Sequence, residues 1–127
     1  MNVPEDLHYT SDHEWARDED GRLRIGITDY AQDALGDIVF VQLPEPGAKV
    51  TAGQSFAEVE STKSVSDIYS PVSGTVAEIN ADLSDSPQRL NDDPYGEGWL
   101  CVIVPDEPSG SGGSLLDAEG YRKLIER

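Results

Sequence analysis

The chain has 127 residues, of which 37% are hydrophobic, so it is long enough to fold as one domain around a buried core. Its net charge of −16, from 9 basic and 25 acidic side chains, would repel phosphate groups and argues against a nucleic-acid-binding protein. No apolar run approaches the roughly 20 residues that span a bilayer, and the N-terminus lacks a signal-peptide pattern. We therefore expect a cytoplasmic protein without a membrane partner, or a mitochondrial matrix protein if a targeting segment has been removed.

Two strands that form a hairpin are expected near the N-terminus. Residues 13–17 have the pattern of a short strand, and the acidic and glycine residues of 18–21 indicate a turn. In residues 22–27, leucine and isoleucine alternate with arginine and glycine, a period of two that is typical of a half-buried strand. The two segments are therefore predicted to pair with each other.

A short helix and a buried strand follow. Asp29 is a candidate N-cap, Gln32 would complete a capping box, and Gly36 would end the helix after barely two turns. Residues 38–43 are apolar at nearly every position, which predicts a strand buried on both faces inside a sandwich.

The chain from there to residue 104 is predicted to be mainly β. Short apolar segments alternate with glycine- and proline-containing turns, which favours a small β-sandwich or barrel. Ser86 is predicted to cap a helical turn that begins at Pro87. The expected strands cover residues 55–61, 65–69, 75–80 and 99–104, and residues 50–53 are expected to form another short element.

A change of composition marks the C-terminal part of what we expect to be one domain, residues 1–127. Residues 106–114 are rich in glycine and serine and predict a flexible connector. Ser114 with Asp117 would form a capping box for a closing helix over residues 115–126. One face of this helix is predicted to pack on the sandwich, with a partner surface as the alternative; it carries Ala118, Tyr121, Leu124 and Ile125.

One lysine lies at the centre of a nearly symmetric pattern. Gly53 precedes Lys63 by ten residues and Gly74 follows it by eleven, and a strand is expected on each side. Hydroxyl-bearing residues surround Lys63, as suits a tight exposed turn. By itself such a lysine is an ordinary solvated side chain. Its setting predicts two similar half-sheets with Lys63 at a hairpin apex, where a modifying enzyme could reach the amine.

The sequence around this lysine resembles the lipoyl-attachment hairpin of the glycine cleavage system H proteins, and other blocks extend the resemblance over nearly the whole chain. It implies a lipoyl/biotinyl-type flattened β-sandwich (a barrel-sandwich hybrid) with short helices and a C-terminal helix. It also implies lipoic acid in amide linkage to Lys63. Biotin carriers place methionines beside their lysine, whereas Thr62 and Ser64 stand here. The matching blocks are residues 60–67 with 69–74, 26–31 through 44–47, 91–99 and 11–15.

The resemblance implies a non-catalytic carrier. In this family the lipoyl arm takes an aminomethyl group from a pyridoxal-phosphate-dependent glycine decarboxylase (P protein) to a folate-dependent aminomethyltransferase (T protein). Dihydrolipoamide dehydrogenase (L protein) then reoxidises the arm, and lipoyl-attaching enzymes are further partners. Two alternatives stay open. One is a paralogous carrier in lipoate relay or another lipoyl-dependent complex. The other is an independent enzyme, for which the sequence offers no nucleophile, acid–base pair or phosphate loop.

Family resemblance also suggests which residues shelter the cargo amine. Glu14 and Asp67 occupy matching positions, and a carboxylate in a cleft would hold a cationic amine by a charge-assisted hydrogen bond. Asp12 is a further candidate, although a hydroxyl residue is expected there in relatives. The alternative for these residues is an ordinary acidic surface.

Other residue types that could carry chemistry are given structural interpretations. The two histidines, His8 and His13, are too few to predict a metal site. Cys101 is the only cysteine, which excludes an internal disulfide, and its apolar strand predicts an inert core thiol. The remaining candidates are predicted to be packing residues: Trp15, Tyr95 and Trp99.

Overall fold

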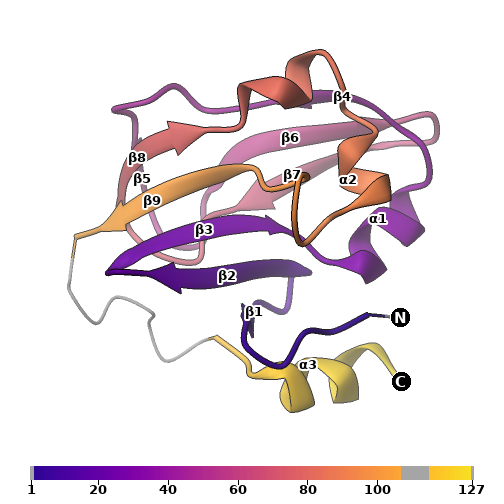
Figure 1. The fold of residues 1–127 in the computed structure, drawn as a ribbon, viewed down its shortest axis with the longest axis horizontal. Coiled ribbons are helices and arrows are strands. Elements are labelled where there is room, and N and C mark those ends of the chain that lie inside the picture. The colour runs from indigo at the N-terminus through magenta and orange to yellow at the C-terminus, as the bar shows by residue number, and fades with distance from the viewer. Residues whose placement is uncertain (1, 107–114, 127) are drawn as a thin grey trace.

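The computed structural model describes residues 2–106 and 115–126, which form two facing antiparallel sheets (Figure 1). The six-stranded sheet has the order β1 (His8–Tyr9), β2 (Glu14–Glu19), β3 (Arg22–Ile27), β9 (Cys101–Pro105), β8 (Gly74–Ile79) and β5 (Lys49–Val50). The three-stranded sheet has the order β4 (Ile38–Gln42), β6 (Ser55–Ser61) and β7 (Val65–Tyr69). The two sheets do not join into a closed barrel, so the predicted flattened β-sandwich is confirmed.

Within the described residues, four short helical segments lie at the margins of the sheets: α1 (Asp29–Leu35), the 3₁₀ segment η1 (Ala81–Ser84), α2 (Arg89–Asp92) and α3 (Ala118–Ile125). None of the helices in the described ranges is long and apolar enough to cross a membrane.

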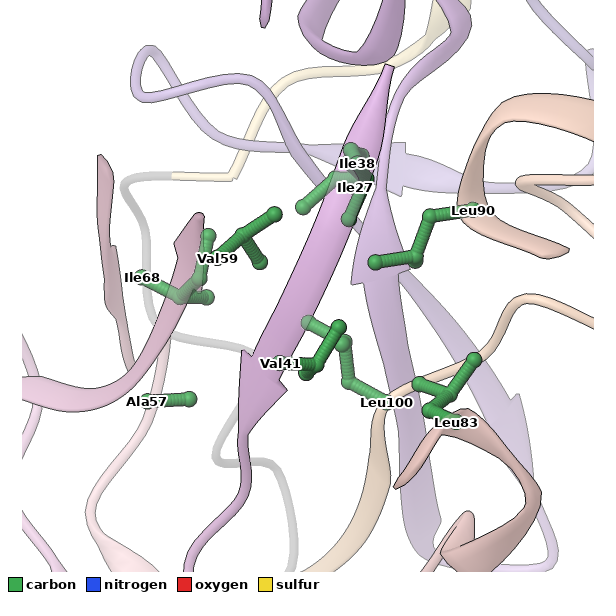
Figure 2. Close-up of a cluster of buried hydrophobic side chains, with 9 residues drawn as sticks. All are labelled: Ile27, Ile38, Val41, Ala57, Val59, Ile68, Leu83, Leu90 and Leu100. Carbon is green, nitrogen blue, oxygen red and sulfur yellow. The ribbon is translucent and has the colours of Figure 1, made fainter. Parts of the chain in front are cut away.

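The main core fills the space between the two sheets (Figure 2). Strand β6 shows how the sequence produces it, because alternate side chains of a strand point to opposite faces. Ala57 and Val59 are buried, whereas Glu60 is exposed on the outer face. The other members of this cluster are Ile27, Ile38, Val41, Ile68, Leu83, Leu90 and Leu100.

Helix α3 packs where the chain begins, as its apolar face predicted. Ala118 and Tyr121 are buried, and the Tyr121 ring stacks on Tyr9 with centroids 4.7 Å apart. The Arg122 guanidinium donates to the carbonyl oxygen of Val3 at 2.9 Å. Both ends of the described chain therefore lie on the same side of the sandwich (Figure 1).

The expectation that residues 38–43 are buried on both faces is wrong. Strand β4 is an edge of the three-stranded sheet, and in the described part of the chain nothing covers the outer face of that sheet. Val39 and Phe40 are consequently 49% and 52% exposed, while Ile38 and Val41 face the core. An apolar run of this length does not by itself distinguish an edge strand from a central one.

The predicted capping residue of α1 is also wrong by one position. The Thr28 hydroxyl caps the helix and accepts from the Ala31 amide at 3.1 Å. Asp29 is the first helical residue, and its carboxylate accepts from the Gln32 side chain at 2.7 Å. Gly36, with φ of +81°, ends the helix as predicted.

The helical turn expected at Pro87 is present, because the amides of Arg89 and Leu90 donate to the carbonyl oxygens of Ser86 and Pro87 at 3.1 and 3.2 Å, but Ser86 is not the side-chain cap of the helix that follows. The amide of Ser86 donates to the carbonyl oxygen of Asp82, so Ser86 belongs to the turn that closes η1. Helix α2 starts at Arg89, after Gln88, and no side chain caps it.

The closing helix is shorter than the predicted range. It begins at Ala118, because Leu116 is extended and exchanges two backbone hydrogen bonds with Tyr9, at 2.7 and 2.6 Å. Asp117 is itself the N-cap and accepts from the Gly120 amide at 2.8 Å. Ser114 and nearly all of the predicted connector lie outside the described residues.

Candidate functional site

The turn between β6 and β7 carries Lys63, with its side chain exposed. The buried hydroxyl of Ser61 organises this turn, because it accepts from the amides of Lys63 and Ser64, both at 3.1 Å. The Ser61 amide donates to the Ser64 carbonyl oxygen at 2.8 Å and closes the turn. Sequence reasoning noted the small hydroxyl residues here but did not identify Ser61 as the one that shapes the backbone.

The Lys63 side chain lies against the loop that follows α1. A Cβ atom added at Gly36 would stand 3.0 Å from Lys63 Cε. The Thr62 amide donates to the carbonyl oxygen of Asp37 at 3.0 Å, so the turn is also fastened to this loop through the backbone. Among the described residues, no carboxylate forms an ion pair with the Lys63 ammonium group.

A cleft of about 370 Å³ opens near the other end of β7. The β1–β2 loop forms one wall with Thr10 and Asp12, which Glu14 at the start of β2 continues, and the turn after β5 and the end of β7 contribute Gly53 and Tyr69. Tyr69 lies six positions after Lys63, so at about 3.3 Å per residue the cleft begins at most about 20 Å from the lysine.

Glu14 is the one acidic side chain in this cleft that is withdrawn from solvent, with 1% of its surface exposed. Its Oε2 accepts from the Tyr69 amide at 2.8 Å, and its Oε1 accepts from the Thr10 hydroxyl at 2.9 Å. Burial raises the pKa of this carboxyl to about 7, against the two hydrogen bonds that lower it. The nearby charge of Asp12 raises the same pKa further.

The three predicted cargo-binding residues are not all brought together. Glu14 and Asp12 line the cleft, with Asp12 exposed at its mouth. Asp67 projects from the outer face of the three-stranded sheet, directly opposite Glu58 in the β6–β7 pairing. The residues that line the cleft, within the described ranges, do not include Asp67. A cargo role for Asp67 therefore stays a prediction.

The loop that carries Glu14 is braced from behind by the C-terminal helix. His13, with φ of +69°, contacts the Tyr30 ring at a tilt of 32° and shares a 2.8 Å hydrogen bond between its Nδ1 and the Tyr121 hydroxyl. The same hydroxyl lies 2.7 Å from that of Thr28. Burial lowers the pKa of His13. Sequence analysis did not find this network, because Tyr121 is 108 residues away from His13 along the chain.

The other sequence candidates occupy structural positions. Cys101 is fully buried, and burial raises the pKa of its thiol to about 12, which suppresses the reactive thiolate. The Trp15 indole donates to the Pro94 carbonyl oxygen at 2.9 Å, and the Arg24 guanidinium lies over the Trp99 ring. In residues 2–106 and 115–126, His, Cys, Asp and Glu form no group of three or more suited to a metal ion.

Comparison with known proteins identifies the family. The glycine cleavage H-protein family matches residues 7–127. The chain belongs to this family. A glycine cleavage system H protein of Mycolicibacterium vanbaalenii is 61% identical over 126 residues, which cover 97% of this chain and 96% of that protein. One of Mycobacterium avium is 59% identical over 128 residues, covering 98% and 97%.

The fold comparison agrees with the sequence comparison. The crystal structure of a glycine cleavage system H protein from Mycobacterium marinum superposes with a TM-score of 0.91. It is 46% identical, and the match covers 98% of this chain and 100% of that one. Membership of the H-protein family confirms the resemblance found in the sequence, and with it a lipoyl-carrier role in the glycine cleavage system.

Proposed function

We propose that the chain carries lipoic acid in amide linkage on Lys63 and passes the aminomethyl group of glycine between enzymes. The observation that carries the proposal is the free Lys63 amine on a turn whose backbone is held by Ser61, near the cleft that contains Glu14. The lipoyl disulfide would supply an attachment point for the one-carbon unit and an acceptor for electrons.

Lys63 fits this role better than the other two lysines. Lys49 lies at the start of β5, whereas Lys123 forms an ion pair with Glu119 on α3 at 3.7 Å. Lys63 stands on a projecting hairpin turn, which an attaching enzyme could enclose. A tether on such a turn keeps one reactive group at high effective concentration near several docked enzymes.

Glu14 would hold the cationic amine of the cargo. With a pKa of about 7, its carboxyl is partly protonated at neutral pH in the empty cleft. An ammonium group at hydrogen-bond distance favours the charged form and would lower that pKa. The resulting charge-assisted hydrogen bond, to a carboxylate that is itself almost fully buried, would protect the amine from loss. Asp12 would add negative charge at the mouth, and Asp67 is the more distant candidate.

The remaining partners follow from the same proposal. The P, T and L proteins would visit the arm in turn, and lipoyl-attaching enzymes would load it. The net charge of −16 would steer the chain toward basic surfaces on these enzymes. In this scheme the chain contributes binding, orientation and protection rather than bond-breaking residues. A cytoplasmic location stays a prediction from the sequence.

Intact-mass measurement and peptide mapping after incubation with lipoate, ATP and a lipoate–protein ligase test the attachment site. We expect one lipoyl increment, found on Lys63 and absent from Lys63→Arg. The Lys63→Arg variant should also lose glycine–bicarbonate exchange with the P protein while keeping the wild-type melting temperature. An increment on Lys49 or Lys123 would contradict the proposal.

The cargo role of Glu14 requires a separate measurement. In Glu14→Ala we expect normal lipoylation but a faster release of the aminomethyl group from the loaded protein, by about 10- to 100-fold, because a charge-assisted hydrogen bond contributes roughly 1.5–3 kcal/mol. Glu58→Ala, on the outer sheet face, is the control. Equal release rates in both variants and the wild type would exclude the role.

A further inference from the structure

We infer that Asn91 is a positioning residue for the modification of Lys63, because it fixes the short loop against which that lysine lies. This inference rests on the proposed attachment of lipoate to Lys63. It gives a task to residues 91–95, which the site described above leaves without one.

The side chain of Asn91 forms hydrogen bonds with the backbone on both sides of Asp37. Its Nδ2 donates to the carbonyl oxygen of Gly36 at 2.8 Å, and its Oδ1 accepts from the amide of Ile38 at 2.9 Å. The same Nδ2 lies 3.1 Å from the Gln32 side-chain oxygen. One amide group therefore satisfies two backbone groups at the exit of α1, where the helix ends and no regular pairing is available.

The loop held in this way is the one that contacts the lysine. Asp37 lies between these two residues, and its carbonyl oxygen accepts a hydrogen bond from the Thr62 amide at 3.0 Å. Gly36 lies next to the Lys63 side chain. Figure 1 shows α1 and α2 at the end of the molecule toward which the β6–β7 turn points. We call residues 36–38 the ledge.

Other contacts fix the two helices, α1 and α2, that hold the ledge in place. The Tyr95 hydroxyl accepts from the Asp29 amide at 3.0 Å at the start of α1 and donates to the Asn2 carbonyl oxygen at 2.6 Å. Leu90, the neighbour of Asn91 in α2, is fully buried in the same core cluster as Ile38 (Figure 2). The segment that carries Asn91 is thus anchored independently of the lysine turn, as a positioning element needs to be.

Glycine at position 36 is favoured by its backbone conformation, and a larger residue there would also contact the Lys63 side chain. Its φ of +81° is a conformation that other L residues adopt at a cost, and a Cβ there would stand 3.0 Å from Lys63 Cε. Gly47 shares the first property, with φ of +89°, but has no atom within 4 Å of an added Cβ. Gly47→Ala therefore also places an alanine at positive φ, but without a contact with Lys63.

The test measures the steady-state lipoylation of the full-length apo protein by a lipoate–protein ligase with lipoate and ATP. We expect kcat/KM to fall by about tenfold in Asn91→Ala and Gly36→Ala, because a misplaced reacting amine reduces the rate steeply. Gly47→Ala should stay within about twofold of the wild type. Asn80→Ala should do the same, since the Asn80 amide donates to the Glu97 and Trp99 carbonyl oxygens and touches neither Gly36 nor Lys63.

Two further measurements keep the inference testable if one variant folds poorly. Asn91→Asp keeps an acceptor for the Ile38 amide but loses the donor to Gly36, and should reproduce the loss of rate. Hydrogen exchange of the Thr62 amide should accelerate in each Asn91 variant, while amides of the β8–β9 ladder stay protected. Wild-type rates in Asn91→Ala and Gly36→Ala, or equal losses in the two controls, would overturn the inference.

The outcome for the wild type separates this inference from the proposed function. If the ligase leaves Lys63 unmodified in the wild-type chain, the proposed function fails. The ledge is then judged by Thr62 exchange alone, which does not depend on the ligase. If the wild type is modified and the Asn91 and Gly36 variants react equally fast, the ledge fails and the proposed function stands.

Discussion

The turn that carries Lys63 and the cleft that contains Glu14 lie toward opposite ends of β7, and they are built from different interactions. At the turn, small hydroxyl and backbone groups satisfy one another, and the lysine ammonium remains in water. In the cleft, a carboxylate with 1% of its surface exposed is held by the Tyr69 amide and the Thr10 hydroxyl.

This difference shows which end of the site lowers the stability of the folded state. An exposed lysine needs little from the fold beyond a fixed turn. A buried carboxylate destabilises the folded state whenever it is ionised, because burial removes it from water. The chain tolerates that cost at the end where cargo would be sheltered, which is where a buried charge can be useful. Mutations at the cleft should therefore alter stability more than those at the turn.

The largest expected effect is the pH dependence of stability at Glu14. The folded-state pKa of about 7 exceeds the ordinary 4.5, so the folded state binds the proton more tightly, and stability falls as pH rises between these values. Glu14→Gln removes this titration. Relative to the wild type it should therefore gain about 3 kcal/mol in free energy of unfolding between pH 4.5 and pH 8, measured by urea denaturation. A difference that does not change with pH would contradict the burial argument.

A smaller change in the free energy of unfolding is expected for the hydrogen-bond network next to the cleft. Tyr121→Phe removes the hydroxyl that forms hydrogen bonds with His13, which is partly buried, and with Thr28, which is fully buried. It should lower the free energy of unfolding by about 2 kcal/mol. Thermal and urea denaturation measure it. Tyr30→Phe is the matched control, because in the described structure the Tyr30 hydroxyl forms no hydrogen bond and only its ring contacts His13. Equal losses would show that the Tyr121 hydroxyl does not brace this loop.

The smallest effect on stability should come from the turn. Ser61→Ala removes the acceptor of the Lys63 and Ser64 amides. Because these amides can donate to water instead, the free energy of unfolding should fall by only about 1 kcal/mol. Lipoylation by the ligase should nevertheless slow several-fold, because the turn loses its fixed shape. Ser64→Ala, with an exposed side chain, serves as the control. If Ser61→Ala proves as destabilising as Tyr121→Phe, the contrast between the two ends is wrong.

Much of the fold could be predicted from local patterns. Period-two alternation located β3, and glycine and proline located the turns, because side-chain direction and backbone freedom are properties of a few neighbouring residues. Apart from the one-position error at the cap of α1, the errors arose where the deciding contact was distant. The apolar run at 38–43 gave no sign that β4 would be an edge strand. Leu116 was predicted to be near the start of a helix but is extended, because it pairs with Tyr9.

The sequence by itself determined the lysine, its turn and the family to which the chain belongs, since each depends on residue types at close spacing. Only the tertiary structure decided what surrounds them. It buried Glu14 against Tyr69, 55 residues away, left Asp67 on the outer face, and brought Asn91 to the loop beneath Lys63. Such contacts depend on how the two sheets and the marginal helices pack. No local pattern specifies which distant backbone group a buried side chain will meet.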